Sequence, residues 1–258
     1  MEGKEVVKKP IKKYGFKVIV ICFWLLLWEV ASWQDPREIF IASPVSVFVT
    51  LIGLIKDGGF WVTIAWSSFR ITAGFVMALA AGIILAAAAY NSSVFRELIS
   101  PVMKIMKTIP VASFIILALL WINNKTNLSI LISFMMVLPL VYTNVLQGLR
   151  ATERELLQMA KVFRISRWKK VVAIYVPAAL PYFISAVSVG MGFCWKAGIA
   201  AEVIGIPSGS IGERLYEAKL YIMTKELFAW TLVIIAISML FEKLVLRLLA
   251  SLQKSPKN

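Results

Sequence analysis

Few residues in this chain could do chemistry. The 258 residues include no histidine, and the only cysteines, Cys22 and Cys194, both lie in apolar runs. This composition argues against zinc sites, imidazole acid–base chemistry and Cys/His catalysis, and it does not predict a structural disulfide. Gly-Lys occurs only at Gly3-Lys4, without the glycine spacing of a nucleotide-binding loop. We therefore expect no enzyme activity and no cofactor site in this chain.

Two ionisable residues stand out near the end of one apolar stretch. Lys196 lies within GMGFCWKAGIAAEVIG, and a lysine near the centre of a membrane helix costs about 2.5–3.5 kcal/mol. It either lines a translocation path and attracts an anion, or it snorkels or pairs with a carboxylate. Glu202 lies about 240° further around the helix, so a direct pair with Lys196 would be poor. Glu202 is a candidate for gating or for docking an outside protein, or it is a plain helix-end carboxylate, and Arg70 is expected to snorkel to the outer interface.

The composition predicts that these residues lie in membrane-spanning helices. Sixty per cent of the residues are hydrophobic and the mean hydropathy is +0.81, which is typical of a polytopic membrane protein. The net charge of +14 could suggest nucleic acid, but the basic residues flank apolar runs, as membrane topology requires. We therefore predict an all-α membrane protein with no nucleic-acid partner.

Six transmembrane helices are predicted from the apolar runs. Five of them cover residues 16–34, 61–90, 128–146, 178–203 and 227–249, and residues 109–122 complete the third, after a cytoplasmic turn and helix entry at 91–108. Small residues crowd the second span and predict a span buried among other helices. Pro110 is expected to kink the start of the third span. Residues 41–55, IASPVSVFVTLIGLI, resemble a short external segment of the family named below, in which a Ser-Pro turn (here Ser43-Pro44) leads into an amphipathic helix along the membrane surface.

The distribution of charge predicts the topology. About twenty Lys and Arg residues fall in segments that six spans place inside, against about six outside, so both termini are expected in the cytoplasm. The predicted segments are a basic cytoplasmic tail (1–17), a first span with an external interfacial segment (18–58), a transmembrane domain (59–250) with a polar loop at 150–177, and a second cytoplasmic tail (251–258).

That polar loop is the most informative stretch, LRATERELLQMAKVFRISRWKKVVAIYVPAALP at Leu149–Pro181. Residues 151–163 favour a short amphipathic helix, Arg164 and Ile165 form the turn, and Ser166 can cap a second helix that ends near Pro177. An amphipathic cytoplasmic helix of this kind has an apolar face that can dock against a partner. An ordinary solvated loop is the alternative.

These residues resemble the coupling loop of binding-protein-dependent ABC importer permeases of type I, in the nitrate, sulfonate and taurine branch. The family loop reads like LLEVARTLGASRWQ…VVLPAALP, against LLQMAKVFRISRWK…IYVPAALP here, and the likeness extends back to about Trp61 and on to the C-terminus. Gln158 replaces the family's Glu, and Arg164 replaces its Gly. Because arginine does not easily adopt a left-handed conformation, a remodelled turn is expected. By position, the resemblance assigns ATPase coupling to five residues: Gln158, Met159, Ala160, Phe163 and Arg164.

The resemblance also implies the partners. They are two ABC ATPase subunits that bind the ATP, an extracytoplasmic solute-binding protein, membrane lipid and a second permease, most simply a second copy of this chain. The implied location is a bacterial or archaeal cell membrane. A small anion such as a sulfonate, taurine or nitrate is the expected cargo, and a thiamine-precursor pyrimidine or another small organic solute is the alternative. A secondary transporter is disfavoured because acidic residues deep in the spans are nearly missing.

Overall fold

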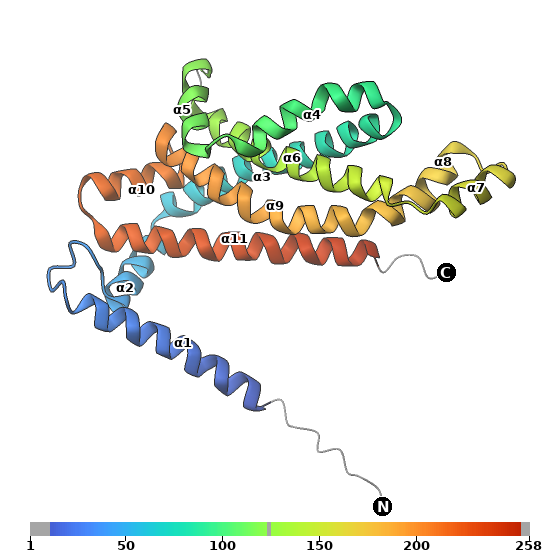
Figure 1. Cartoon of the computed structure of the whole chain (residues 1–258). Coiled ribbons are helices and arrows are strands. Elements are labelled where there is room, and N and C mark those ends of the chain that lie inside the picture. The colour runs from blue at the N-terminus through green and yellow to red at the C-terminus, as the bar shows by residue number, and fades with distance from the viewer. Residues whose placement is uncertain (1–10, 123–124, 254–258) are drawn as a thin grey trace, which may run out of the picture.

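The computed structural model describes residues 11–122 and 125–253, and the regular structure within them is helical (Figure 1). The helices are α1 (Ile11–Ser32), α2 (Pro44–Ile55), α3 (Gly58–Asn91), α4 (Ser93–Thr108), α5 (Val111–Trp121), α6 (Leu128–Arg150), α7 (Arg154–Val162), α8 (Arg167–Lys170), α9 (Val176–Gly205), α10 (Ile211–Leu220) and α11 (Thr224–Gln253). A short 3-10 turn covers Lys125–Asn127, and a π-helical turn covers Val171–Tyr175. Residues 1–10 and 254–258 of the two predicted tails lie outside the described residues.

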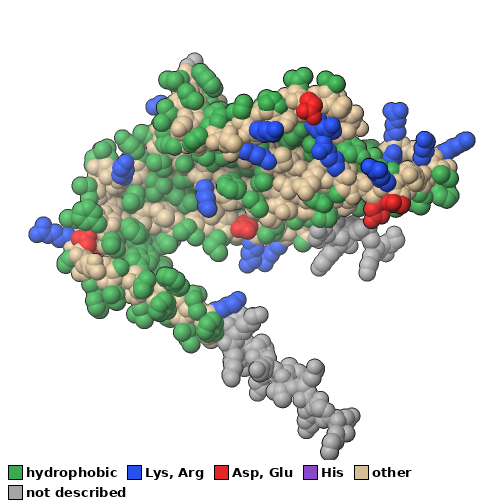
Figure 2. Space-filling view, viewed as in Figure 1, with side chains coloured by type: hydrophobic (Ala, Val, Ile, Leu, Met, Phe, Trp, Pro, Cys, Tyr) green, Lys and Arg blue, Asp and Glu red, His purple; other side chains and the backbone are tan. Residues whose placement is uncertain are grey.

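Four long helices, α3, α6, α9 and α11, run along the length of the molecule (Figure 1). α6 packs against both α3 and α9 and is therefore the central helix of the bundle. α7 and α8 extend from one end, hereafter the α7 end, and α10 covers the opposite end, hereafter the α10 end. Lysine and arginine side chains gather at the α7 end on the face shown in Figure 2.

Small residues bring these helices close together. On α3, Gly74, Ala78 and Gly82 recur every four residues and are buried. A Cβ atom on Gly74 would overlap the carbonyl oxygen of Ile130 on α6, and one on Gly82 would lie 2.7 Å from a methyl group of Val141. The predicted burial of this span is therefore found on the face toward α6, while side chains such as Ile84 on the other face are exposed.

The number of membrane spans differs from the six predicted. By length and composition, four of the described helical stretches could cross a membrane, or five if α4 and α5 form one broken span. They are Gly15–Ser32, Gly58–Asn91, Lys125–Arg150, Arg167–Gly205 and the broken pair Ser93–Thr108 with Val111–Trp121. α11 coincides with the predicted sixth span but is not among these stretches. The count of six is therefore not confirmed.

The third predicted span needs a correction. The chain bends by 110° between α4 and α5, at Ile109 and Pro110. Proline at this position has no N–H to continue the ladder and disfavours helical geometry in the residue before it, so the chain turns a corner where a kink was expected. α5 has 11 residues and a length of about 16 Å, too short to cross a hydrocarbon core of about 30 Å. Residues 109–122 alone are therefore not a span.

The segment before α3 is anchored at the α10 end. As predicted, a Ser-Pro turn begins α2: the Ser43 hydroxyl accepts a hydrogen bond from the Ser46 N–H. Glu38 in the preceding loop forms a 2.8 Å ion pair with Lys225 at the start of α11. The Lys225 ammonium lowers the pKa of Glu38 from 4.5 to about 2. The stabilisation from this pair is complete above pH 4.5 and is lost only as the pH falls through about 2.

Candidate functional site

The first candidate site is the helix–turn–helix at the α7 end. Of the five residues assigned to coupling, Ala160 is 2% exposed and packs inward, whereas Gln158, Met159, Phe163 and Arg164 are exposed. Phe163 is 72% exposed, and Val162 and Trp168 beside it are exposed too. Large apolar side chains at the charged end of a bundle are expected to be covered by another protein.

The turn after α7 places Arg164 in the left-handed conformation that its side chain was expected to disfavour. Arg164 has φ +50°, its N–H donates to the Lys161 carbonyl (3.1 Å), and the Ile165 N–H donates to the Ala160 carbonyl (2.9 Å). This pair of bonds is the Schellman ending that a glycine usually completes. The two bonds satisfy carbonyls that would otherwise be orphaned, which offsets the cost of about 1–2 kcal/mol for a non-glycine residue there.

The helix after the turn is longer than predicted. Its start is confirmed, because the Ser166 hydroxyl caps α8 by accepting from the Lys169 N–H. It does not end near Pro177: α8 continues through the π-helical turn into α9. In that turn the Val176 N–H bonds to the Val171 carbonyl, five residues back. Pro177 falls at the start of α9, where a missing N–H costs little. α8 and α9 are therefore one continuous helical segment.

The second candidate site is the open face of α9, which carries Lys196. Val189, Phe193 and Lys196 are exposed at helical spacing and form one stripe. Within the part of the chain described, Lys196 makes no ion pair. Pairing with Glu202 is ruled out by direction, since Glu202 is fully buried on another side of the helix.

Glu202 instead ties three helices together at the α10 end. Its Oε2 accepts hydrogen bonds from the Ser67 hydroxyl on α3 (2.8 Å) and from the Gly212 N–H at the start of α10 (3.3 Å). Ser67 in turn accepts from the Ile211 N–H (2.9 Å). Nη1 of Arg70 lies 3.8 Å from Oε1 of Glu202. This buried cluster holds α10 onto α3 and α9.

Arg70 was misjudged from the sequence, because it is buried and does not snorkel to an interface. A signal existed: Arg70 and Glu202 are opposite charges that both lie beside long apolar runs, and such charges usually pair. Ser67 and Gly212 carried no such signal, since only the folded chain brings them to Glu202.

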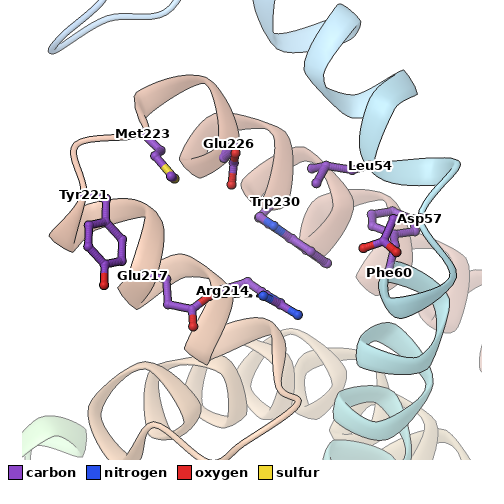
Figure 3. Close-up of a pocket in the computed structure, with 9 residues that line it drawn as sticks. All are labelled: Leu54, Asp57, Phe60, Arg214, Glu217, Tyr221, Met223, Glu226 and Trp230. Atoms are coloured by element: carbon purple, nitrogen blue, oxygen red, sulfur yellow. Dashed lines mark hydrogen bonds and ion pairs between the residues drawn. The ribbon is translucent and has the colours of Figure 1, made fainter.

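A pocket of about 310 Å³ opens at the α10 end, beside α10 and α11 (Figure 3). Asp57, Glu217 and Glu226 bring carboxylates to it, and Arg214 pairs with Glu217 at 3.2 Å. Trp230, whose ring centroid lies 5.1 Å from that of Phe60, forms an aromatic wall. The α10 end therefore presents a polar recess with an aromatic wall, a form that suits a protein partner.

Comparison with known proteins identifies the family of this chain. Residues 78–257 match the family described as binding-protein-dependent transport system inner membrane component. The chain belongs to this family. It is a permease subunit, which carries no ATPase of its own, and a multi-pass component of the inner membrane. The family predicted from the loop at Leu149–Pro181 is thus confirmed.

Three relatives of this permease belong to the predicted branch. The taurine transport system permease protein TauC of Escherichia coli is 25% identical, over 88% of this chain and 83% of its own length. The bicarbonate transport system permease protein CmpB of Synechococcus elongatus is 24% identical, over 86% and 83%. The nitrate import permease protein NrtB of Synechocystis is 24% identical, over 78% and 75%.

A solved structure has the same fold. A chain in an inward-facing structure of the MetNI methionine ABC transporter aligns with a TM-score of 0.51 and 16% identity, covering 74% of this permease and 94% of that chain. The helical permease fold predicted from the sequence is therefore confirmed.

Proposed function

We propose that this permease forms the translocation path of an ATP-driven importer for a small anion. Two permeases, most simply two copies of this chain, would line the path, two ATPase subunits would bind ATP, and a solute-binding protein would deliver the cargo. The observation that supports an anionic cargo is Lys196. This exposed cation has no ion-pair partner among the described residues and lies in a helix long enough to cross the membrane. The cargoes named for the relatives, taurine, bicarbonate and nitrate, support the same class.

In this proposal the α7 end faces the cytoplasm. Its basic residues favour that side by the positive-inside rule. They are Arg150, Arg154, Lys161, Arg164, Arg167, Lys169 and Lys170. The orientation also places both termini in the cytoplasm.

Gln158, Met159, Ala160, Phe163 and Arg164 would form the contact with the ATPase. Ala160 seats α7 against the rest of the chain, and the exposed Phe163 enters the ATPase surface. Closure of the ATPase dimer would then move α7 as a rigid body and, through α8, tilt α9.

The α10 end faces the outside in the same proposal. The pocket in Figure 3 offers the binding protein carboxylates, an arginine and an aromatic wall at that surface. The Glu202 cluster would keep α10 in place while the binding protein docks, because it fixes the first turn of α10 to α3 and α9.

Substitution of Lys196 tests the path. We expect Lys196→Met to reduce ATP-dependent uptake by at least tenfold in proteoliposomes that contain the ATPase and the loaded binding protein, whereas Lys196→Arg should retain most of it. Binding-protein ligands would be identified first by a thermal-shift screen, which supplies the labelled cargo. Full uptake by Lys196→Met would contradict the proposed role of this lysine.

A further inference from the structure

The corner between α4 and α5 borders an open cavity to which the function described above assigns no role. Its volume is about 470 Å³, and α4, α5, α6 and α9 all contribute to its wall. The lining residues are Met106, Lys107, Ile109, Val111, Met136, Pro139, Leu140 and Phe193. All but Lys107 are apolar, so the cavity has one charged group on an otherwise apolar surface.

Lys107 is held in place but is not neutralised. Its Nζ donates a hydrogen bond to the Thr143 hydroxyl on α6 at 3.1 Å, and Thr143 donates in turn to the Pro139 carbonyl at 2.7 Å. Among the described residues no carboxylate forms an ion pair with Lys107. The hydroxyl fixes the direction of the ammonium group and leaves its charge available.

Lys107 belongs to the broken pair of α4 and α5, one of the stretches that could cross a membrane, and in a membrane span an unpaired charge is costly unless water or an anion reaches it. Its partner Thr143 lies seven residues before Arg150, the last residue of α6. Thr143 is therefore about 10 Å from the end of α6 that lies at the α7 end. A lysine that faces lipid at membrane depth is strongly disfavoured. The cavity is therefore expected to open to an aqueous space instead of to lipid.

The cavity also lies next to the open face of α9. Phe193 forms part of its wall, is 52% exposed and precedes Lys196 by three residues, about one helical turn. Lys196 lies nine residues from the end of α9 at the α10 end, about 13 Å along the helix. The cavity thus lies between one cation nearer the α10 end and another nearer the α7 end.

We infer that this cavity is an anion-binding station on the translocation path, with Lys107 as its counter-charge and a small oxyanion such as a sulfonate as its ligand. The inference rests on the proposed function, because it needs the open face of α9 to be the path. A cation that is hydrogen-bonded on one side and open on the other can attract an oxyanion. The walls of Met106, Met136 and Phe193 can accept a short apolar tail on the same molecule.

A thiol-labelling experiment tests the station with a sulfonate as the probe. In the assembled transporter, with Cys22→Ser and Cys194→Ala, the single replacement Phe193→Cys places a thiol in the cavity wall. Its reaction rates with anionic sulfonatoethyl methanethiosulfonate and with cationic trimethylammonioethyl methanethiosulfonate would be compared. Removal of one positive charge within about 8 Å in water should lower the anionic-to-cationic rate ratio about fivefold. We expect that drop for Lys107→Gln.

A matched control separates this local charge from the general potential of a basic protein. Lys104 lies one turn earlier on α4 and does not line the cavity, so Lys104→Gln should lower the ratio by a clearly smaller factor than Lys107→Gln. Met136→Cys provides a second thiol position in case Phe193→Cys does not assemble. If Lys107→Gln leaves the anionic-to-cationic rate ratio unchanged, or if Lys104→Gln lowers it equally, the cavity is not an anion-binding station with Lys107 as its counter-charge. That outcome is distinct from failure of the proposed function, which would appear as uptake unaffected by Lys196→Met.

Discussion

The double replacement of Phe163 by alanine and Arg164 by glutamate is expected to abolish co-purification of the ATPase with this permease. Phe163 is 72% exposed and would become buried at the contact, and truncation of a buried aromatic anchor costs about 2 kcal/mol or more. The charge reversal adds repulsion if the ATPase surface is acidic, as the basic α7 end favours. At about 1.4 kcal/mol per factor of ten, the combined loss exceeds thirtyfold in affinity.

The control for this experiment carries comparable changes on α11, a different helix. Leu244 and Arg247 on α11 are exposed, and Leu244→Ala with Arg247→Glu removes one apolar side chain and reverses one charge. This control should retain the ATPase after affinity purification of the tagged permease. Equal retention by both double variants would show that α7 is not the ATPase contact.

Replacement of Gly74 by alanine is expected to disrupt the bundle itself. The added methyl group would overlap the backbone of Ile130, which cannot move away as the tip of a side chain could. Overpacking of a tight interface usually costs 1–3 kcal/mol, and a backbone clash between α3 and α6 should reach about 3 kcal/mol or more. The expected result is aggregation on detergent extraction, or a much lower thermal transition on size-exclusion chromatography.

Gly53 provides the matched substitution for Gly74. It lies inside α2, and a Cβ atom there meets no other atom within 4 Å. Gly53→Ala should therefore leave the thermal transition unchanged or raise it slightly through helix propensity. If Gly74→Ala melted at the same temperature as Gly53→Ala, the close packing of α3 on α6 would be wrong.

Much of this architecture could be predicted because membranes impose simple rules. Apolar runs predicted the positions of α1, α3, α6 and α9. In lipid the backbone N–H and C=O groups of each span must hydrogen-bond within that span, so each long apolar run forms a helix. The capped turn at Ser166 followed from local chemistry in the same way. These features depend on neighbouring residues in the chain and can therefore be read from the sequence.

Features that depend on the folded chain could not be predicted. After the 110° corner α5 packs against both α6 and α9, whereas Pro110 alone predicts no more than a kink. The left-handed Arg164 is stabilised by the two closing hydrogen bonds of the turn, which outweigh its intrinsic preference. Arg70 is buried because Glu202 lies opposite it, on a helix more than one hundred residues later.

The central claim is that the α7 end faces the cytoplasm and receives force from a separate ATPase. The most direct measurement uses Trp168→Cys in the chain with Cys22→Ser and Cys194→Ala, labelled with a membrane-impermeant maleimide in oriented vesicles. We predict labelling in inside-out vesicles only, with protection when the ATPase is bound. Labelling in right-side-out vesicles only, or labelling that the ATPase does not affect, would contradict this account.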